Sequence, residues 1–165
     1  MINAGFTELL LGLLAVLLVV AAVIDVRTFT ISNGLNATVA LLAPVYWWSI
    51  GLPLWPEAAI QLLVATAVFG ALALAFYIGM MGGGDVKLAA ALALWFSPVT
   101  TVKFLVIMSL AGGVLTLLVL AIHKKRENSA LDENETPEKP EVPYGVAIAI
   151  GALWILAQRF LNQFA

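Results

Sequence analysis

Residues 58–87 read AAIQLLVATAVFGALALAFYIGMMGGGDVK, and this stretch decides the class of the fold. Its first part, 58–81, contains no charged side chain and is long enough to cross a hydrocarbon core, which takes about 20 apolar residues. Three glycines and Asp85 follow, where the apolar run meets polar residues. A carboxylate in or near hydrocarbon is costly and usually has a partner and a function. The stretch therefore predicts a transmembrane helix followed by a functional acid.

The rest of the chain has the same apolar character. Hydrophobic residues make up 62% of it and charged residues 11%, with a mean hydropathy of +1.03, whereas a soluble domain has about 25% charged residues. Further apolar runs lie at 6–25, 35–50, 86–97, 99–122 and 144–162. We therefore predict an all-α integral membrane protein with about six transmembrane helices in a single domain, residues 1–165, in contact with membrane lipid. The run at 86–97 reaches only about 18 Å, which indicates a short, recessed helix.

The basic residues predict the orientation in the membrane. If the first helix ends at the cytoplasm, six of the eight basic residues lie on the cytoplasmic side, and only Lys103 and Arg159 lie on the other. Both chain ends are then expected on the side away from the cytoplasm. Asp25, at the end of the first helix, falls on the same cytoplasmic face as Asp85.

The most polar segment is residues 123–143, where most of the charge of the chain lies. It has no apolar periodicity, so we expect a flexible, charged cytoplasmic loop. Its acidic residues are either a tether for a basic substrate segment or a solvated linker, and the linker is the usual behaviour of such runs. The charge pattern has no nucleic-acid signature.

Asp25 and Asp85 are the candidate catalytic residues. Two carboxylates on one membrane face are able to share a proton and to activate a water molecule between them. Such a pair titrates as a unit that retains one proton near neutral pH. Because Asp85 is expected at a helix N-terminus and Asp25 at a helix C-terminus, the helix dipoles predict an ionised Asp85 and a protonated Asp25. The pattern favours an intramembrane aspartyl protease that needs no covalent intermediate.

Gly82, Gly83 and Gly84 precede Asp85 directly. Residues without a Cβ adopt backbone angles closed to others and let another chain approach closely, which suits a site that grips a substrate backbone. Glycine-rich turns between membrane helices are also common, and Asp85 alone is equally well explained as a helix N-cap. Asp25 alone is readily explained by an interfacial ion pair with Arg27. The presence of both acids on one face favours a functional interpretation.

Three polar residues near the acids are candidate supporting residues. Arg27 and Lys87 are cations able to stabilise the acid pair or a substrate carbonyl, although anchoring at the membrane interface explains each of them somewhat better. Asn33 is a candidate polar site residue, with an N-cap or turn role as the more common alternative. The five tryptophans fall mostly near predicted helix ends and indicate aromatic belts at the membrane interfaces.

The chain contains no cysteine and a single histidine, His123. The absence of cysteine excludes disulfides, thiolate catalysis and cysteine-based zinc sites. One histidine argues against a histidine-built metal centre. We therefore expect neither a metal nor a cofactor.

Three segments resemble the signatures of the type IV prepilin peptidases, a GxGD family of intramembrane aspartyl proteases. Residues 25–33, DVRTFTISN, resemble the family pattern D-x-R-x-x-x-I-x-N, and residues 82–88, GGGDVKL, resemble G-x-G-D-x-K-L. Residues 142–147, VPYGVA, are similar to the motif that opens the last helix of the family. Presenilin and signal peptide peptidase share G-x-G-D but add a Pro-Ala-Leu motif, which this chain lacks.

This resemblance implies cleavage of prepilin-like substrates, which have a short basic leader followed by an apolar helix. The cut would follow a glycine at the cytoplasmic edge of that helix, in the bacterial inner membrane. Larger relatives carry a cytoplasmic region with four zinc-binding cysteines and a methyltransferase activity, and this chain lacks that region. Its length resembles the short forms associated with tight-adherence (Flp) pili.

Two other classes of function remain open from the residues alone. A small proton-coupled transporter would also place acids among apolar helices, but near the membrane midplane and often in related halves, and no internal repeat is visible. A non-catalytic pilus-assembly membrane protein would need no acid pair. Loss of precursor cleavage on replacement of either aspartate would separate the peptidase from both.

Overall fold

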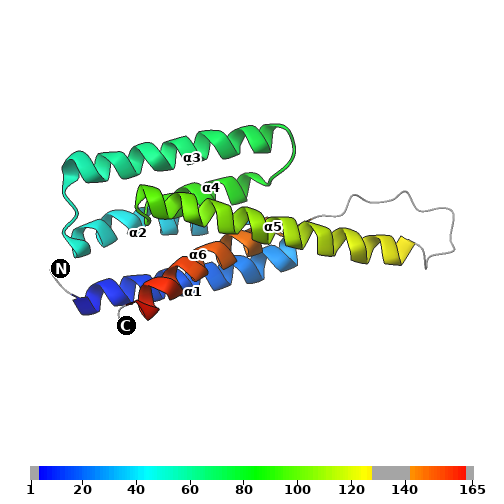
Figure 1. The fold of residues 1–165 in the computed structure, drawn as a ribbon, viewed down its shortest axis with the longest axis horizontal. Helices are drawn as coiled ribbons and strands as arrows, with labels where there is room; N and C mark the ends of the chain where they lie inside the picture. Colours follow the sequence, from blue (N-terminus) through cyan, green and yellow to red (C-terminus); the bar gives the residue numbers. More distant parts are fainter. Residues whose placement is uncertain (1–3, 128–141, 163–165) are drawn as a thin grey trace.

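The computed structural model describes residues 4–127 and 142–162, and all of their regular structure is helical. Figure 1 shows the bundle that these helices form. In chain order the elements are α1 (Ala4–Thr28), α2 (Asn33–Ile50), the π-helical turn η1 (Leu54–Ala58), α3 (Ala59–Tyr77), α4 (Gly83–Ala93), α5 (Pro98–Glu127) and α6 (Tyr144–Leu161). The prediction of an all-α membrane protein with about six helices is confirmed.

Four helical segments are long and apolar enough to cross a membrane: α1, η1 together with α3, α5 up to Lys124, and α6. Large apolar side chains on α1, α3 and α5 point outward, among them Leu9, Leu63 and Leu117. An apolar surface of this extent is favourable in contact with lipid and unfavourable in contact with water. The outward faces of these helices therefore indicate an integral membrane protein.

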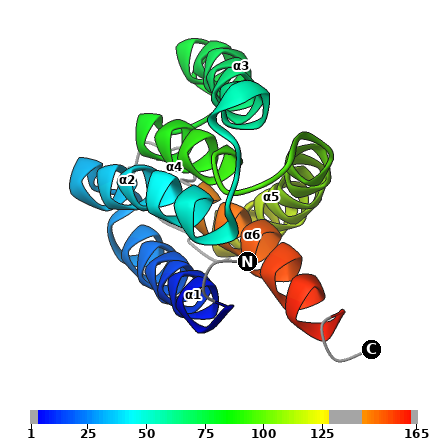
Figure 2. The ribbon, with the colours of Figure 1, turned by 90° about the vertical axis from the view of Figure 1, so that its left-hand side faces the viewer.

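The short helix α4 has eleven residues and is enclosed by other helices. It packs against α2, α3 and α6, and the end-on view of Figure 2 shows it inside the bundle. Eight of the eleven residues of α4 are buried, including the alanine run 89–91, whose small side chains let neighbouring helices approach closely. A helix too short to cross the membrane is therefore stable here, because the surrounding helices shield most of its surface from lipid.

Two tryptophans join α2 to the end of α4. The indole N–H of Trp47 donates to the backbone carbonyl of Leu94 at 2.7 Å, and that of Trp95 donates to the carbonyl of Val39 at 3.0 Å. Both side chains are buried. The expectation that the tryptophans form interfacial belts is therefore wrong for Trp47 and Trp95, because these two satisfy backbone carbonyls inside the bundle.

The caps and bounds of three helix ends show how local sequence sets where a helix begins or ends. Ser97 caps α5 by accepting a hydrogen bond from the backbone N–H of Thr100, and Pro98 is the first residue of the helix, as the preferences of serine and proline for these two positions favour. The cap of α2 is Ser32 rather than Asn33. Helix α5 continues to Glu127, so residues 123–127, expected at the start of the charged loop, are helical. Most of the expected loop, residues 128–141, lies outside the described residues.

Candidate active site

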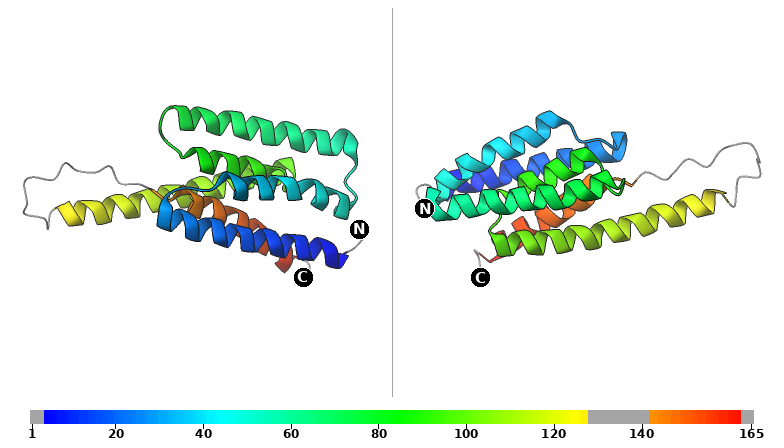
Figure 3. Two further views of the ribbon diagram at one scale, coloured as in Figure 1. Left: turned by 180° about the vertical axis from the view of Figure 1, so that it is seen from behind. Right: turned by 90° about the horizontal axis from the view of Figure 1, so that it is seen from above.

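Asp25 and Asp85 are both buried at the same end of the bundle. Asp25 lies in the last turn of α1 and Asp85 in the first turn of α4, with exposed fractions of 2% and 7%. Helix α6 begins at this end as well, and it packs against both α1 and α4. Figure 3 shows the end of α1 beside the start of α6. The structure thus brings together two acids that are 60 positions apart in the chain.

Asp25 accepts a hydrogen bond from the start of α6. Its Oδ2 lies 2.7 Å from the backbone nitrogen of Gly145, the second residue of that helix. The first N–H groups of a helix have no partner within the helix and stabilise negative charge. Asp25 therefore faces the positive end of α6, although it stands near the C-terminal end of its own helix.

Asp85 has fewer partners. Its Oδ1 is buried and has no hydrogen-bond partner among the described residues. Helix α4 is not among the four segments able to span a membrane. Burial of the Asp85 side chain, and to a smaller extent the negative charge of Asp25, raise the pKa of Asp85 to about 7. A hydrogen bond from the backbone N–H of Gly82 lowers this pKa, but by less. A buried acceptor without a donor disfavours the ionised form. The hydrogen bonds thus favour an ionised Asp25 and a protonated Asp85, the reverse of the assignment expected from α1 and α4 alone.

Ile31 fills the space between α4 and α6 beside the two acids. A methyl group built on Gly84 would lie 2.8 Å from the backbone oxygen of Ile31, and one built on Gly145 would lie 2.8 Å from the Ile31 Cδ1 atom. Only residues without a Cβ allow this approach. The connection between α1 and α2 is therefore held directly against the starts of both α4 and α6.

At Gly82 and Gly83, just before Asp85, neighbouring side chains occupy the space that a Cβ atom would need. Gly82 has φ −71° and ψ 144°, an extended conformation that any residue adopts. A Cβ at Gly82 would lie 2.7 Å from Oδ2 of Asp85. A Cβ at Gly83 would lie 3.3 Å from the ring of Phe76. The space at these two glycines is thus taken up by side chains of the protein itself, and the approach of a substrate backbone stays a prediction.

Asn33 and Lys87 contact each other directly. Lys87 Nζ donates to Asn33 Oδ1 at 2.7 Å, which joins the start of α2 to the first turn of α4. Both side chains are exposed. Arg27 is also exposed, and no ion pair joins it to either aspartate among the described residues. The candidate residues Asn33 and Lys87 are therefore brought together, whereas Arg27 remains on the surface of α1.

Asn36, one turn after Asn33, was missed by the sequence reasoning. It is 5% exposed, and its side-chain nitrogen donates to the backbone carbonyl of Gly84 at 3.0 Å. Its Oδ1 is buried and accepts no hydrogen bond from the part of the chain that the structure describes. Together with Asn33 and Lys87 it lines a cavity of about 540 Å³ between α2, α3 and α4, whose other walls are apolar apart from Thr66. This cavity adjoins the glycine run.

Gly145 was also missed as a site residue, although the motif that contains it was noted. Its position on an apolar helix far from either acid in sequence gave no reason to single it out. A Cβ there would lie 2.8 Å from the carboxylate of Asp25. Both the donated N–H and the absent side chain of Gly145 therefore shape the environment of Asp25.

Comparison with protein-family models gives one match. Residues 12–117 match the model described as the type IV leader peptidase family. The match covers more than half of the chain and includes both aspartates and the glycine run, whereas Gly145 lies beyond it. Searches among curated proteins and solved structures gave no match.

Proposed function

The chain belongs to the type IV leader peptidase family, and we propose that it is an intramembrane aspartyl endopeptidase that cleaves the leader of prepilin-like proteins with Asp25 and Asp85. One observation carries this proposal. Two buried carboxylates from distant parts of the matched region meet beside a helix N-terminus, in environments that favour different protonation states. A transporter or a non-catalytic assembly protein would not require this asymmetry.

The asymmetry assigns the roles in catalysis. The Asp25 carboxylate removes a proton from a water molecule, and the water oxygen attacks the scissile carbonyl carbon. Protonated Asp85 donates its proton to the carbonyl oxygen, giving a neutral tetrahedral intermediate. Collapse of the intermediate breaks the C–N bond, with Asp25 returning its proton to the leaving amine and Asp85 recovering the proton from the hydroxyl. The N–H of Gly145 holds Asp25 in place throughout.

The cavity between α2, α3 and α4 is the candidate position for the substrate. Its apolar walls suit the apolar segment of a prepilin, and Asn36 Oδ1 offers a buried acceptor to a substrate backbone N–H. Lys87 lies at the end of the cavity next to the glycine run. Asn33, which holds Lys87, then acts as a positioning residue.

Purified protein in detergent, incubated with a prepilin, tests the function directly. We expect cleavage at one peptide bond, identified by N-terminal sequencing of the product, without any added metal or cofactor. The precursors offered should include prepilins of the tight-adherence class. Absence of cleavage by folded protein, with every prepilin class offered in a lipid bilayer, would contradict the proposal.

The active site is proposed to face the cytoplasm in a bacterial inner membrane. Because the chain has no cysteine, single cysteines report topology without background. Met80→Cys lies at the dyad end, between α3 and α4, and Leu54→Cys lies at the opposite end, and both native side chains are exposed. A membrane-impermeant maleimide applied to intact spheroplasts should label Leu54→Cys and not Met80→Cys. The reverse pattern would invert the topology.

The pH dependence of cleavage follows from the protonation of Asp85. Its raised pKa of about 7 means that Asp85 is protonated below this pH and loses its proton as pH rises through it. Because the mechanism needs the protonated form, kcat/KM should fall on the basic side with an apparent pKa of about 7. A pH profile of the purified enzyme, with circular dichroism as a control for folding, checks this. An undiminished rate well above pH 7 would contradict the assignment.

A further inference from the structure

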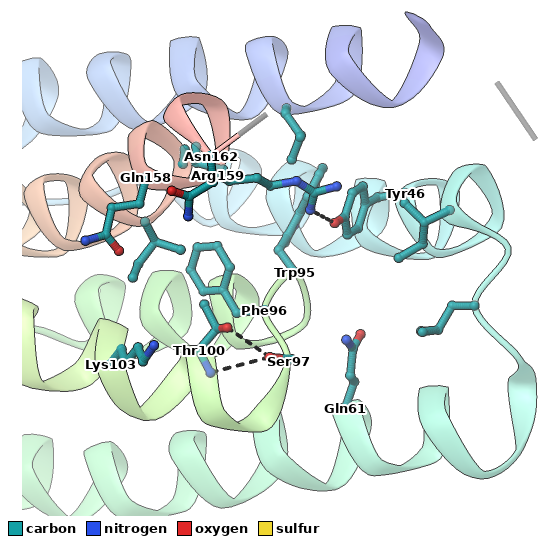
Figure 4. A pocket seen from close by; sticks show the side chains of 15 residues that line it. Tyr46, Gln61, Trp95, Phe96, Ser97, Thr100, Lys103, Gln158, Arg159 and Asn162 are labelled. Atoms are coloured by element: carbon teal, nitrogen blue, oxygen red, sulfur yellow. Dashed lines mark hydrogen bonds between the residues drawn. The ribbon is translucent and has the colours of Figure 1, made fainter. Parts of the chain in front are cut away.

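A second cavity lies at the end of the bundle opposite the two aspartates. Its volume is about 630 Å³, and residues from the ends of α2, α4 and α6 and the starts of α3 and α5 line it. Figure 4 shows the side chains around it. Nothing in the proposed peptidase mechanism uses this cavity.

The cavity is positively charged. Lys103 and Arg159, the only two basic residues expected on the side away from the cytoplasm, both line it, and none of its lining residues is acidic. The guanidinium of Arg159 donates to the hydroxyl of Tyr46 and lies 5.6 Å from the centre of its ring. Tyr46 in turn stacks on Trp95. One of the two cations is therefore held in place by buried aromatic residues.

Gln61 adds a buried acceptor. It lies near the start of the apolar helix α3 and is 7% exposed, and its Oε1 atom has no hydrogen-bond partner within residues 4–127 and 142–162. Figure 4 shows its side chain directed from α3 into the cavity. An unpaired buried carbonyl oxygen is costly unless a donor reaches it. The cavity thus presents two cations for an anion and, at Gln61, a buried acceptor for a hydroxyl or amine.

The remaining walls are apolar at one set of residues, Leu11, Ile50, Leu52, Phe96, Ile155 and Leu156, and polar at another, Ser97, Thr100, Gln158 and Asn162. A ligand that matches the whole cavity has a negative charge, a hydrogen-bond donor close to that charge, and a hydrocarbon part. We propose that the cavity binds an anionic glycerophospholipid whose phosphodiester head group carries free hydroxyls, as in phosphatidylglycerol. The phosphate lies between Lys103 and Arg159, and a head-group hydroxyl donates to Gln61 Oε1.

Two related lipids match less well. Phosphatidylethanolamine would place an ammonium group near Lys103 and Arg159, where like charges repel. Phosphatidic acid has the phosphate but no head-group hydroxyl for Gln61. The proposed order of affinity is therefore phosphatidylglycerol, then phosphatidic acid, then phosphatidylethanolamine.

Native mass spectrometry of the full-length protein, titrated with each lipid in detergent, tests this order. Lys103→Gln should weaken phosphatidylglycerol binding about tenfold, as expected for loss of one charge-assisted contact. Lys124→Gln is the matched control, because it removes an exposed cation from the same helix at its other end, and it should change nothing. Equal binding of phosphatidylglycerol and phosphatidylethanolamine, or equal loss in both variants, would overturn the proposal.

Gln61→Leu separates the hydroxyl contact from the charge contact. Without lipid, this variant should have a higher melting temperature, because it removes an unpaired buried carbonyl. It should also bind phosphatidylglycerol no better than phosphatidic acid. Retention of the preference would overturn the role of Gln61. Binding of soluble glycerophosphoglycerol as tight as that of the lipid would overturn the lipid as ligand in favour of a free phosphodiester.

Discussion

Asp25→Asn and Asp85→Asn are each expected to lower the rate of prepilin cleavage by a factor on the order of 10⁴ or more, and the double variant should be little worse than either single one. Residues that act as one catalytic unit lose nearly all activity at the first replacement. Asparagine is close to aspartate in size but neither removes a proton from water nor delivers one to a carbonyl oxygen. Cleavage of a co-expressed prepilin, followed by immunoblotting, measures the effect.

The control for this prediction is Glu57→Gln. Glu57 is exposed at the opposite end of the bundle, so its replacement makes the same chemical change without touching the acid pair. It should cleave at the wild-type rate. Each variant must be present in the membrane at normal abundance. Substantial cleavage by either single aspartate variant under these conditions would contradict the catalytic roles of the pair.

The number and position of the helices were predictable because the solvent is hydrocarbon. Runs of about 20 apolar residues leave few alternatives to a helix when every backbone group must be paired internally. The same reasoning predicted the short helix after the glycine run, since the apolar stretch there is brief. The extension of α5 to Glu127 was not predicted, because charged residues give no apolar signal by which to recognise the end of the helix.

The environment of the acids was only half predictable. Sequence order placed Asp25 at the end of one helix and Asp85 at the start of another, which are local properties. The partner of Asp25 is the start of α6, which is 120 positions away in the chain. No local pattern encodes this contact. Because the dipole of α6 opposes that of α1 at Asp25, reasoning from a single helix gave the opposite proton assignment to the one that the contact with α6 favours.

Asn33 and Asn36 illustrate the same limit on a smaller scale. One turn separates them on α2, and both are ordinary residues near a helix start. Asn33 accepts from Lys87 at the exposed surface, whereas Asn36 is buried and donates to Gly84. Only the packing of α4 against α2 distinguishes them. The sequence alone marks both asparagines as polar residues near a helix start, whereas their different contacts follow from how α2 and α4 pack.

Gly145 provides the sharpest test of how α6 controls the acid pair. A methyl group at this position would lie 2.8 Å from both the carboxylate of Asp25 and the Cδ1 atom of Ile31, which is closer than unbonded atoms approach. Ile31 does not move freely, since its backbone is also in close contact with Gly84. The carboxylate of Asp25 must therefore shift away from α6 and lose the hydrogen bond from the Gly145 N–H.

Gly145→Ala is accordingly expected to lower kcat about 100-fold, the loss typical of a misplacement of about 1 Å in a catalytic group. Stability should change much less, because alanine favours the helix by roughly 1 kcal/mol over glycine and offsets part of the crowding. Gly113→Ala is the matched control: it makes the same change within α5, where a methyl group meets nothing within 4 Å, and it should retain full activity. Steady-state kinetics and thermal unfolding of both purified variants give the comparison. A Gly145→Ala enzyme with wild-type kcat would show that the hydrogen bond from α6 does not position Asp25 for catalysis.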